Sequence, residues 1–303
     1  MKDYTLKYGK GSVTFALDEA HVTELYGTPV PKIDDIRAAL YATLSSPVSH
    51  EPLESWVNPG DKVALIVSDM SRFWMRQDLV VPHIISYLTD KCDVNQNNIT
   101  IIIANGTHPG GDENELRTLV TDGVYDRIRV VNHDCQAKDL VYIGTTSLGT
   151  EVRINPIAAN ADKVIMLGAC TYHVMAGYGG GRKSILPGIS GLETIRQNHL
   201  HSLDLLAPRS NPLIGNGVTD GNPLNEDMCQ AAAMVKNLFG INLVTNADMQ
   251  LAHIISGDPM KSWQLACHRV DEIYRVPIVK KADVIITSCG GYPKDMSLYQ
   301  GTK

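Results

Sequence analysis

The chain has 303 residues and a mass of 33.1 kDa, enough for roughly two domains of about 150 residues each. Its 44% hydrophobic and 20% charged residues are typical of a globular protein and exclude disorder and collagen-like structure. The net charge of −6 and the pI of about 5.9 favour neither nucleic acid nor an anionic membrane as a partner.

Short runs rich in β-branched residues recur along the chain and predict strands. They lie at residues 13–17, 62–69, 99–105, 127–131, 151–155, 162–168, 241–246 and 283–288. Between several of them, apolar residues at helical spacing predict helices at residues 78–91, 113–120, 225–239 and 260–275. Buried strands that alternate with amphipathic helices indicate α/β layers around a largely parallel sheet.

A polar stretch, CDVNQNN (92–98), separates a predicted helix from a new strand. It predicts a boundary near residue 95, between an N-terminal α/β domain (1–95) and a second α/β domain (96–303). The chain stops soon after a predicted strand and a glycine turn, before any helix that would cover the sheet. We therefore expect the natural polypeptide to continue beyond Lys303, which an intact mass above 33.1 kDa would support.

The densest chemistry follows the predicted strand 162–168, in a segment where three consecutive glycines precede Arg182 and Lys183. Ligands in open α/β sheets bind beyond the carboxyl ends of strands, and a glycine loop lets backbone N–H groups approach an anion closely. A helix predicted to begin near Gly191 would add its positive end. This segment therefore predicts an anion-binding site, with a charged fork and a reachable amine.

Residues 177–184 nearly match a phosphate-binding P-loop, GxxxxGK[ST], but Arg182 stands where the last glycine belongs. An arginine brings a side chain to a position that needs bare backbone, and the loop starts well after its strand. Both departures disfavour a P-loop nucleotide-hydrolysing enzyme. For this motif alone, a mobile glycine loop with a solvated Arg–Lys pair is the plainer alternative.

Other predicted strands also end in residues that can do chemistry. Asp69 and Arg72 follow one strand within SDMSR (68–72), and His108 follows another within NGTH. A rigid sheet can present such loop residues together. With His173 before the glycine loop, these residues indicate an anion-binding α/β enzyme that uses histidine acid–base chemistry.

These motifs resemble those of the nickel-dependent lactate racemase family. The resemblance runs from about residue 10 to the end and is carried by residues 172–199, with SDMSR (68–72), NGTH (105–108) and GGYPKDMSLYQGTK (290–303). It implies a two-domain α/β enzyme with the active site in the cleft between the domains. It also implies a nickel-pincer nucleotide, a pyridinium-derived mononucleotide whose sulfur arms hold nickel and which is tethered to a lysine as a thioamide.

Matched position by position, the resemblance implies a role for each residue. Lys183 matches the tethering lysine and His199 the protein ligand to nickel, while His108 and His173 match the two catalytic histidines. The residues that match groups holding the substrate are Arg72, Gln300 and Lys303. The residues expected around the cofactor, besides the lysine, are Gly179, Gly180, Gly181 and Asp69.

The implied reaction is racemisation or epimerisation of a 2-hydroxy acid by reversible hydride transfer to the cofactor. One histidine would take the hydroxyl proton and the other would return a proton, which suits an imidazole pKa near neutrality. The cofactor comes from dedicated maturation enzymes, which would be partners of the chain. A heterologous host that lacks them would yield cofactor-free protein.

The chain departs from the family pattern Asp-x-Thr-Arg-Pro, because Ser71 replaces the threonine and Phe73 and Trp74 follow the arginine. The two aromatics either reshape the substrate pocket or pack between domains. Pro109 replaces a basic residue often found after the catalytic histidine. Lactate is therefore one candidate among 2-hydroxy acids that include longer, dicarboxylic and sugar-derived ones.

Two rival functions remain open at this point. One is a P-loop-like phosphotransferase, and the other is a non-catalytic binder of the cofactor or a related nucleotide.

The six cysteines are scattered and contain no CxxC pair, which favours reduced thiols in a cytoplasmic protein over a disulfide framework or a zinc site. The first ten residues, MKDYTLKYGK, lack the apolar core of a signal peptide. The apolar runs are far shorter than the roughly 20 residues that cross a bilayer. We expect neither a membrane nor a nucleic acid as a partner.

Overall fold

The computed structural model describes residues 1–292 and residue 295. Residues 29–273 form the larger of two compact units, and residues 1–28 with the described residues from 274 onward form the smaller one. The larger unit holds a six-stranded sheet in the order β12-β11-β8-β3-β4-β5. The bounds of its strands are β3 Val63–Ser68, β4 Ile99–Ala104, β5 Arg129–Asn132, β8 Lys163–Ala169, β11 Leu238–Thr245 and β12 Leu251–Gly257.

Every neighbouring pair from β11 to β5 is parallel, and only β12 at the edge runs antiparallel to its neighbour. The predicted α/β fold with a mostly parallel sheet is confirmed. The central strands read as nearly continuous apolar runs, such as VALIVS in β3, because helices cover both faces of the sheet. The β-branched runs at 62–69, 99–105 and 162–168 form the strands β3, β4 and β8, as predicted, and these are neighbours in the sheet.

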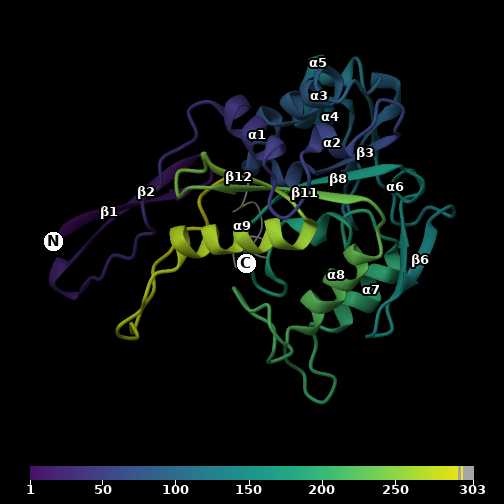
Figure 1. Cartoon of the computed structure of the whole chain (residues 1–303). Coiled ribbons are helices and arrows are strands. Elements are labelled where there is room, and N and C mark those ends of the chain that lie inside the picture. Colours follow the sequence, from purple (N-terminus) through teal and green to yellow (C-terminus); the bar gives the residue numbers. More distant parts are fainter. Residues whose placement is uncertain (293–294, 296–303) are drawn as a thin grey trace. The chain divides into compact units, whose positions relative to one another are not determined.

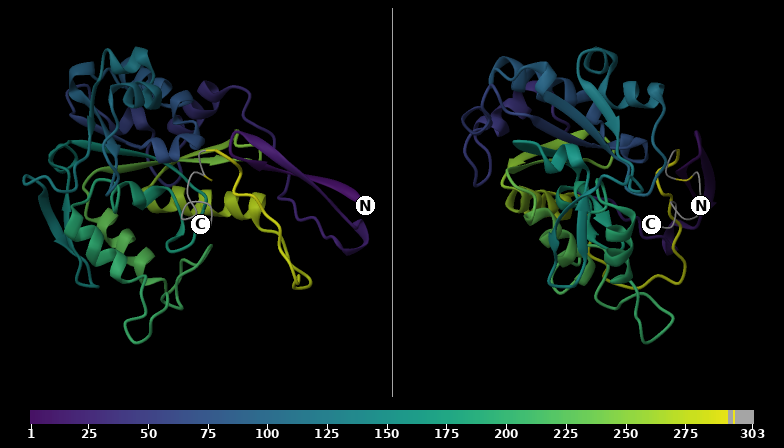
Figure 2. Two further views of the ribbon diagram at one scale, coloured as in Figure 1. Left: turned by 180° about the vertical axis from the view of Figure 1, so that it is seen from behind. Right: turned by 90° about the vertical axis from the view of Figure 1, so that its right-hand side faces the viewer.

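Helices lie in two layers, one on each face of the sheet (Figures 1 and 2). The layer formed by the earlier helices contains α1 Ile36–Ser45, α2 Leu53–Trp56, α3 Val81–Asp90, α4 Glu113–Val120 and α5 Asp122–Tyr125. The opposite layer contains α6 Pro156–Ala159, α7 Leu192–Leu200, α8 Pro223–Ala233 and α9 Pro259–Tyr274. Each layer packs on its own cluster of buried apolar side chains.

Local signals in the sequence explain where several helices begin. The side chain of Asp112 accepts a hydrogen bond from the Glu115 amide at the start of α4, and Asn222 does the same for Asn225 at the start of α8. The helix predicted at 225–239 extends too far, because α8 ends at Ala233 and residues 238–239 already belong to β11. Short apolar runs do not by themselves separate helix from strand.

Smaller elements connect these layers. Two antiparallel hairpins belong to the larger unit, β6 Val141–Thr145 with β7 Glu151–Ile154, and β9 Tyr172–His173 with β10 Gly177–Tyr178. The 3₁₀ turns of the larger unit are η2 Met70–Met75, η3 Gln77–Leu79, η4 Gln96–Asn98 and η5 Gly181–Ser184, whereas η1 Glu19–His21 belongs to the smaller unit.

The smaller unit contains the antiparallel hairpin of β1 Lys2–Tyr8 and β2 Gly11–Leu17. The strand predicted at 283–288 is wrong for the described structure, since no strand there pairs with it. Val284 and Ile285 are 75% and 79% exposed. An apolar β-branched run becomes a strand only when another strand satisfies its backbone hydrogen bonds.

The predicted boundary near residue 95 falls between β3 and β4, which are adjacent parallel strands of one sheet. The compact units follow a different division of the chain, and a domain that ends at residue 95 stays a prediction. In the described part of the chain, no helix has both the length and the apolar character needed to cross a membrane.

Candidate active site

Three neighbouring strands of the sheet end in segments that carry predicted site residues. β3 leads into Asp69, β4 leads into the NGTH segment with His108, and β8 leads into the hairpin that carries His173. The sheet order places β3 between β8 and β4. Because these strands are parallel, their carboxyl ends meet at one edge of the sheet, where α/β enzymes bind their ligands.

A short hydrogen bond joins two of these strand ends. Asp69 Oδ2 lies 2.5 Å from His108 Nδ1, and the hydroxyl of Ser71 donates to Asp69 Oδ1 at 2.6 Å. Burial alone would raise the pKa of Asp69, but the hydrogen bonds from His108 and Ser71 and the nearby positive charge of Arg72 outweigh it and hold this pKa below its usual value. Asp69 is therefore a carboxylate at neutral pH.

The carboxylate fixes which nitrogen of His108 can act on a substrate. Nδ1 carries the proton that is donated to Asp69, so Nε2 of the neutral ring presents a lone pair. The His108 side chain is 47% exposed, whereas that of Asp69 is only 11% exposed. A buried carboxylate that orients an accessible imidazole is a common arrangement for a general base.

Two buried amides that the sequence analysis missed shape the same edge. The Gln77 side chain accepts a hydrogen bond from the Ser68 amide and donates one to the Ser68 carbonyl. It thus satisfies the backbone at the end of β3 as a neighbouring strand would. Asn105 accepts from the His133 amide and donates to the Pro109 carbonyl. Both amides are at most 2% exposed. Gln77 carries no sequence signal of its own, and the NGTH motif that begins at Asn105 points to its histidine, so burial is what identifies these two amides.

His173 is held in a different way from His108. Its Nδ1 accepts hydrogen bonds from the backbone amides of Met175 and Ala176, at 3.2 and 3.1 Å. A nitrogen that accepts in this way holds a lone pair, so Nε2 carries the proton of the neutral ring. The β9–β10 hairpin thus positions its own histidine through its backbone.

Arg182 is not part of a solvated basic pair. It is completely buried, and its guanidinium donates to Asn225 Oδ1 and to backbone carbonyls. The carbonyls belong to Ala176, Tyr178, Gly179 and Gly180. The guanidinium carbon also lies 3.7 Å from the centroid of the Trp263 ring. This arginine stabilises the glycine loop through its buried guanidinium. The expectation that the guanidinium would face a bound anion is therefore wrong.

The three glycines are required by close packing. A Cβ on Gly180 would lie 3.0 Å from the Ala169 carbonyl oxygen, and one on Gly181 would lie 2.8 Å from the Trp263 ring. Both residues also have positive φ, at +72° and +49°. The Gly181 amide already donates to Asn242 Oδ1, and the Gly179 amide to the Thr171 carbonyl. A phosphate cradle at residues 179–181 stays a prediction, with two of its three amides already bonded within the protein.

Lys183 lies next to this buried arginine on the short turn η5 and is half-buried. Its carbonyl accepts from the amide of Gly188, and the carbonyl of Gly188 accepts from the amide of Gly106. Two backbone hydrogen bonds therefore connect the lysine segment to the NGTH segment that carries His108. The structure brings the predicted tether and one predicted catalytic histidine onto the same connected framework.

His199 lies in the last turn of α7. Its Nδ1 is 2.9 Å from the carbonyl oxygen of Ile195 and donates to it, so Nε2 holds the lone pair that a metal ion would need. Among residues 1–292 and 295, no group of three His, Cys, Asp or Glu side chains is arranged to hold a metal ion. The geometry of His199 fits a single imidazole ligand.

The predicted substrate residues are only partly within the described structure. Arg72 lies on η2, and its Nη1 donates to the hydroxyl of Ser71 at 3.1 Å. Gln300 and Lys303 lie outside the described residues. Phe73 and Trp74 are partly buried and pack against the hydrophobic core beneath α1–α5.

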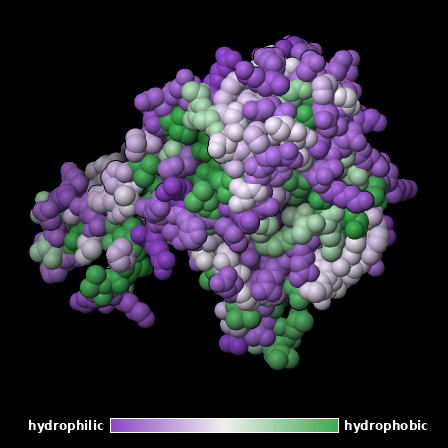
Figure 3. Space-filling view, viewed as in Figure 1, coloured by the Kyte–Doolittle hydropathy of each residue, from purple (hydrophilic) through white to green (hydrophobic). Residues whose placement is uncertain are grey.

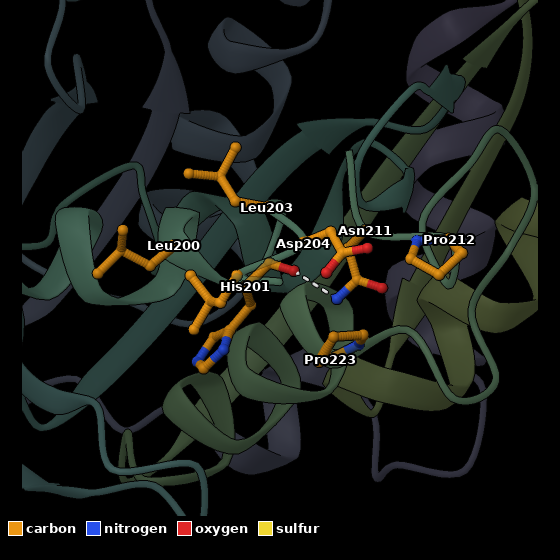
Figure 4. Close-up of a pocket in the computed structure, with 8 residues that line it drawn as sticks. Leu200, His201, Leu203, Asp204, Asn211, Pro212 and Pro223 are labelled. Atoms are coloured by element: carbon orange, nitrogen blue, oxygen red, sulfur yellow. Dashed lines mark hydrogen bonds between the residues drawn. The ribbon is translucent and has the colours of Figure 1, made fainter. Parts of the chain in front are cut away.

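A pocket of about 350 Å³ is lined by residues that begin directly after His199 in the sequence, at Leu200. Figure 4 shows its lining, where the side chain of Asn211 donates to the His201 carbonyl. The loop beyond it exposes leucines, including Leu206 at 98%, and forms the hydrophobic tip at the bottom of Figure 3. Neither catalytic histidine candidate lines the pocket, so we assign it no part in the chemistry.

Comparison with known proteins decides the family. The model of the lactate racemase N-terminal domain matches residues 8–209, which is well over half of the chain. The chain belongs to the lactate racemase family. Members of this family are isomerases, and the resemblance found in the sequence is confirmed.

Curated relatives and a solved structure agree with this placement. The lactate racemase of Thermoanaerobacterium thermosaccharolyticum is 29% identical over 100% of this chain and 70% of its own length. That of Lactiplantibacillus plantarum is 28% identical over 98% of this chain and 69% of its own length. The apoprotein structure of the Thermoanaerobacterium enzyme superposes with a TM-score of 0.88 at 27% identity, covering 100% of this chain and 70% of that one.

A protein from Thermotoga maritima shares the fold at 18% identity. Its TM-score is 0.61, over 82% of this chain and 61% of that one.

Proposed function

We propose that the protein is a racemase or epimerase of a 2-hydroxy acid, with lactate as the first candidate substrate, and that it uses a nickel-pincer nucleotide tethered to Lys183. Two relatives that align with nearly the whole chain are lactate racemases. The observation that carries the proposal is the Asp69–His108 pair, which presents an imidazole lone pair at the edge where Lys183 is anchored. Family membership and local geometry point to the same chemistry.

The residues present fit the proposed cofactor. Lys183 would be its covalent attachment, and His199 Nε2 would supply one donor to the nickel, because Nδ1 is already fixed by Ile195. The predicted contacts of the nucleotide with Asp69 and with residues 179–181 remain part of this proposal. When bound, the nucleotide would accept the α-hydrogen of the substrate as hydride and return it.

The protein's own groups would hold the substrate and move its hydroxyl proton. Arg72 offers a guanidinium that can bind a carboxylate through two parallel hydrogen bonds, and Gln300 and Lys303 would add to this contact. His108 Nε2 would take the hydroxyl proton of one enantiomer. His173 would face the hydroxyl of the other enantiomer, since inversion of the carbon turns that oxygen toward the opposite wall.

The P-loop alternative is disfavoured by the geometry. A P-loop needs free backbone amides and a glycine at the position of Arg182, which here is buried beneath the loop. The partners that we propose are a small 2-hydroxy acid and the enzymes that make and load the cofactor. We also propose a cytoplasmic location, which the free thiols of all six cysteines support.

The test is a set of single-enantiomer 2-hydroxy acids incubated with protein co-produced with the maturation enzymes. It would include lactate and longer, dicarboxylic and sugar-derived acids, with products separated by chiral chromatography. We expect at least one acid to approach an equal mixture from either enantiomer. Nickel-loaded protein that leaves every acid unchanged would refute the proposed function.

A further inference from the structure

One face of α9 contacts the segment between β8 and Lys183 at three successive positions. Trp263 donates from Nε1 to the Gly179 carbonyl at 2.9 Å. One helical turn later, the Sγ atom of Cys267 lies 3.7 Å from that of Cys170. A further turn on comes Asp271. Spacing of four residues places all three side chains on one side of the helix, so α9 supports this segment along its length.

Asp271 joins both strands of the hairpin that carries His173. Its Oδ1 accepts hydrogen bonds from the hydroxyls of Tyr172 and Tyr178, each at 2.7 Å. These two tyrosines are paired across β9 and β10, and their ring centroids lie 5.4 Å apart. Burial, together with the bond to Asp271, raises the pKa of Tyr178, so its hydroxyl keeps the proton that it donates.

The hairpin is held from outside its two strands, on one side by Arg182, which donates to the Ala176 and Tyr178 carbonyls, and on the other by Asp271. Each of its strands is only two residues long, and an isolated pair of short strands has little stability in water. The imidazole of His173 is bonded through Nδ1 to amides of the same hairpin. Ring and hairpin therefore move as one piece, and a tilt of the hairpin displaces Nε2 from the substrate.

We propose that Asp271 is a positioning residue for His173, because its carboxylate fixes the β9–β10 hairpin through Tyr172 and Tyr178. This inference rests on the proposed function, since it concerns the placement of one of the two histidines that would face the substrate. Asp271 does not touch the reacting atoms and acts through the two tyrosines. A displacement of about 1 Å at a catalytic group can lower a rate roughly 10²-fold.

The test compares Asp271→Ala and Asp271→Asn with the matched control Glu272→Ala. Glu272 is the next residue on α9, is exposed and pairs with Arg269. Hydrogen–deuterium exchange of residues 171–178 is measured on the cofactor-free protein, and kcat and KM for lactate on the loaded enzyme. Tyr172→Phe serves as a second variant, since it removes one of the two bonds while leaving the carboxylate in place.

We expect Asp271→Ala to speed exchange in the hairpin and to lower kcat about 10- to 100-fold, with KM unchanged because Arg72 is untouched. Asp271→Asn keeps an acceptor oxygen and should recover most of kcat, and Tyr172→Phe should fall between the two. Glu272→Ala should match the wild type. If Asp271→Ala matches Glu272→Ala in exchange and in kcat, or raises KM alone, the proposal is wrong.

The readouts separate the two proposals. If the loaded wild-type protein racemises nothing, the proposed function fails, while the exchange data still decide whether Asp271 holds the hairpin.

Discussion

The two histidines that are proposed to face the substrate are held by opposite chemistry. At His108, a buried carboxylate accepts a hydrogen bond from Nδ1–H, which leaves a lone pair on Nε2. At His173, two backbone amides donate to Nδ1, so the proton of the neutral ring resides on Nε2. One site is built from a side chain at a neighbouring strand end, and the other from the backbone of its own hairpin.

This difference indicates that the two imidazoles are not interchangeable. His108 can accept a proton at Nε2 without changing its hydrogen bond to Asp69. His173 can accept a proton at Nε2 only after the proton there has moved, and protonation of Nδ1 would break both bonds to the amides. His173 presents an N–H group at Nε2, so it is the better placed of the two to return a proton to the substrate oxygen.

The largest expected effect comes from replacing each imidazole by Ala or by Gln. His108→Ala and His173→Ala should abolish racemisation in both directions, and general acid–base catalysis typically accounts for roughly 10²- to 10⁴-fold in rate. His108→Gln should be as inactive as His108→Ala, because an amide supplies no base. His173→Gln should likewise be inactive, because an amide can donate a hydrogen bond but releases no proton to the substrate oxygen.

Initial rates from each enantiomer of lactate, measured on preparations matched for nickel content, would decide this. The exposed His21, whose side chain is 83% exposed, provides the control His21→Ala. A His173→Gln enzyme that keeps most of the wild-type rate would show that His173 only donates a hydrogen bond, and would contradict its part in proton transfer.

A smaller effect is expected when the carboxylate beside His108 is neutralised. Asp69→Asn can present an N–H group to Nδ1, which would move the imidazole proton to Nε2 and remove the base. We expect kcat to fall roughly 10²-fold, the lower end of the range for general acid–base catalysis, while the fold is preserved. Ser71→Ala, which removes only the second bond to the carboxylate, should cost much less. Comparable losses in both variants would argue against control of the tautomer by Asp69.

The smallest effect is on stability against acid. The pKa of Asp69 in the folded protein lies below its usual value of 3.8, so its stabilising contribution is complete above that pH and is lost as pH falls through the folded value. Urea unfolding should show Asp69→Asn to be less stable than the wild type near neutrality, with the difference shrinking below pH 3.8. A difference that stays constant down to pH 2 would contradict the stated origin of the shift.

Much of the fold could be predicted because its signals are local. The buried strands β3, β4 and β8 are continuous β-branched runs, and their parallel order follows from the helices between them. The prediction failed where a partner decides the outcome. Residues 283–288 have the composition of a strand, yet no described strand pairs with them.

The sequence singles out candidate reactive residues, whose roles stay predictions, but it does not single out the residues that support them. His108, His173, Lys183 and His199 stand out through motif and position. The burial of Arg182 could not be predicted, because a basic residue after glycines is equally compatible with a solvated loop and with a buried side chain that stabilises the loop. Asp271 could not be predicted from the sequence, since its proposed role depends on contacts between α9 and a hairpin that lies far away in the sequence.

The most direct test of the account is intact mass together with nickel content, measured on protein co-produced with the maturation enzymes, beside Lys183→Ala. We predict an added mass of nucleotide size and one nickel ion per chain, both absent from Lys183→Ala. His199→Ala should keep the nucleotide and lose nickel, because His199 supplies only a metal ligand. No added mass and no nickel on the wild-type chain would contradict the claim that Lys183 tethers a nickel-bearing nucleotide.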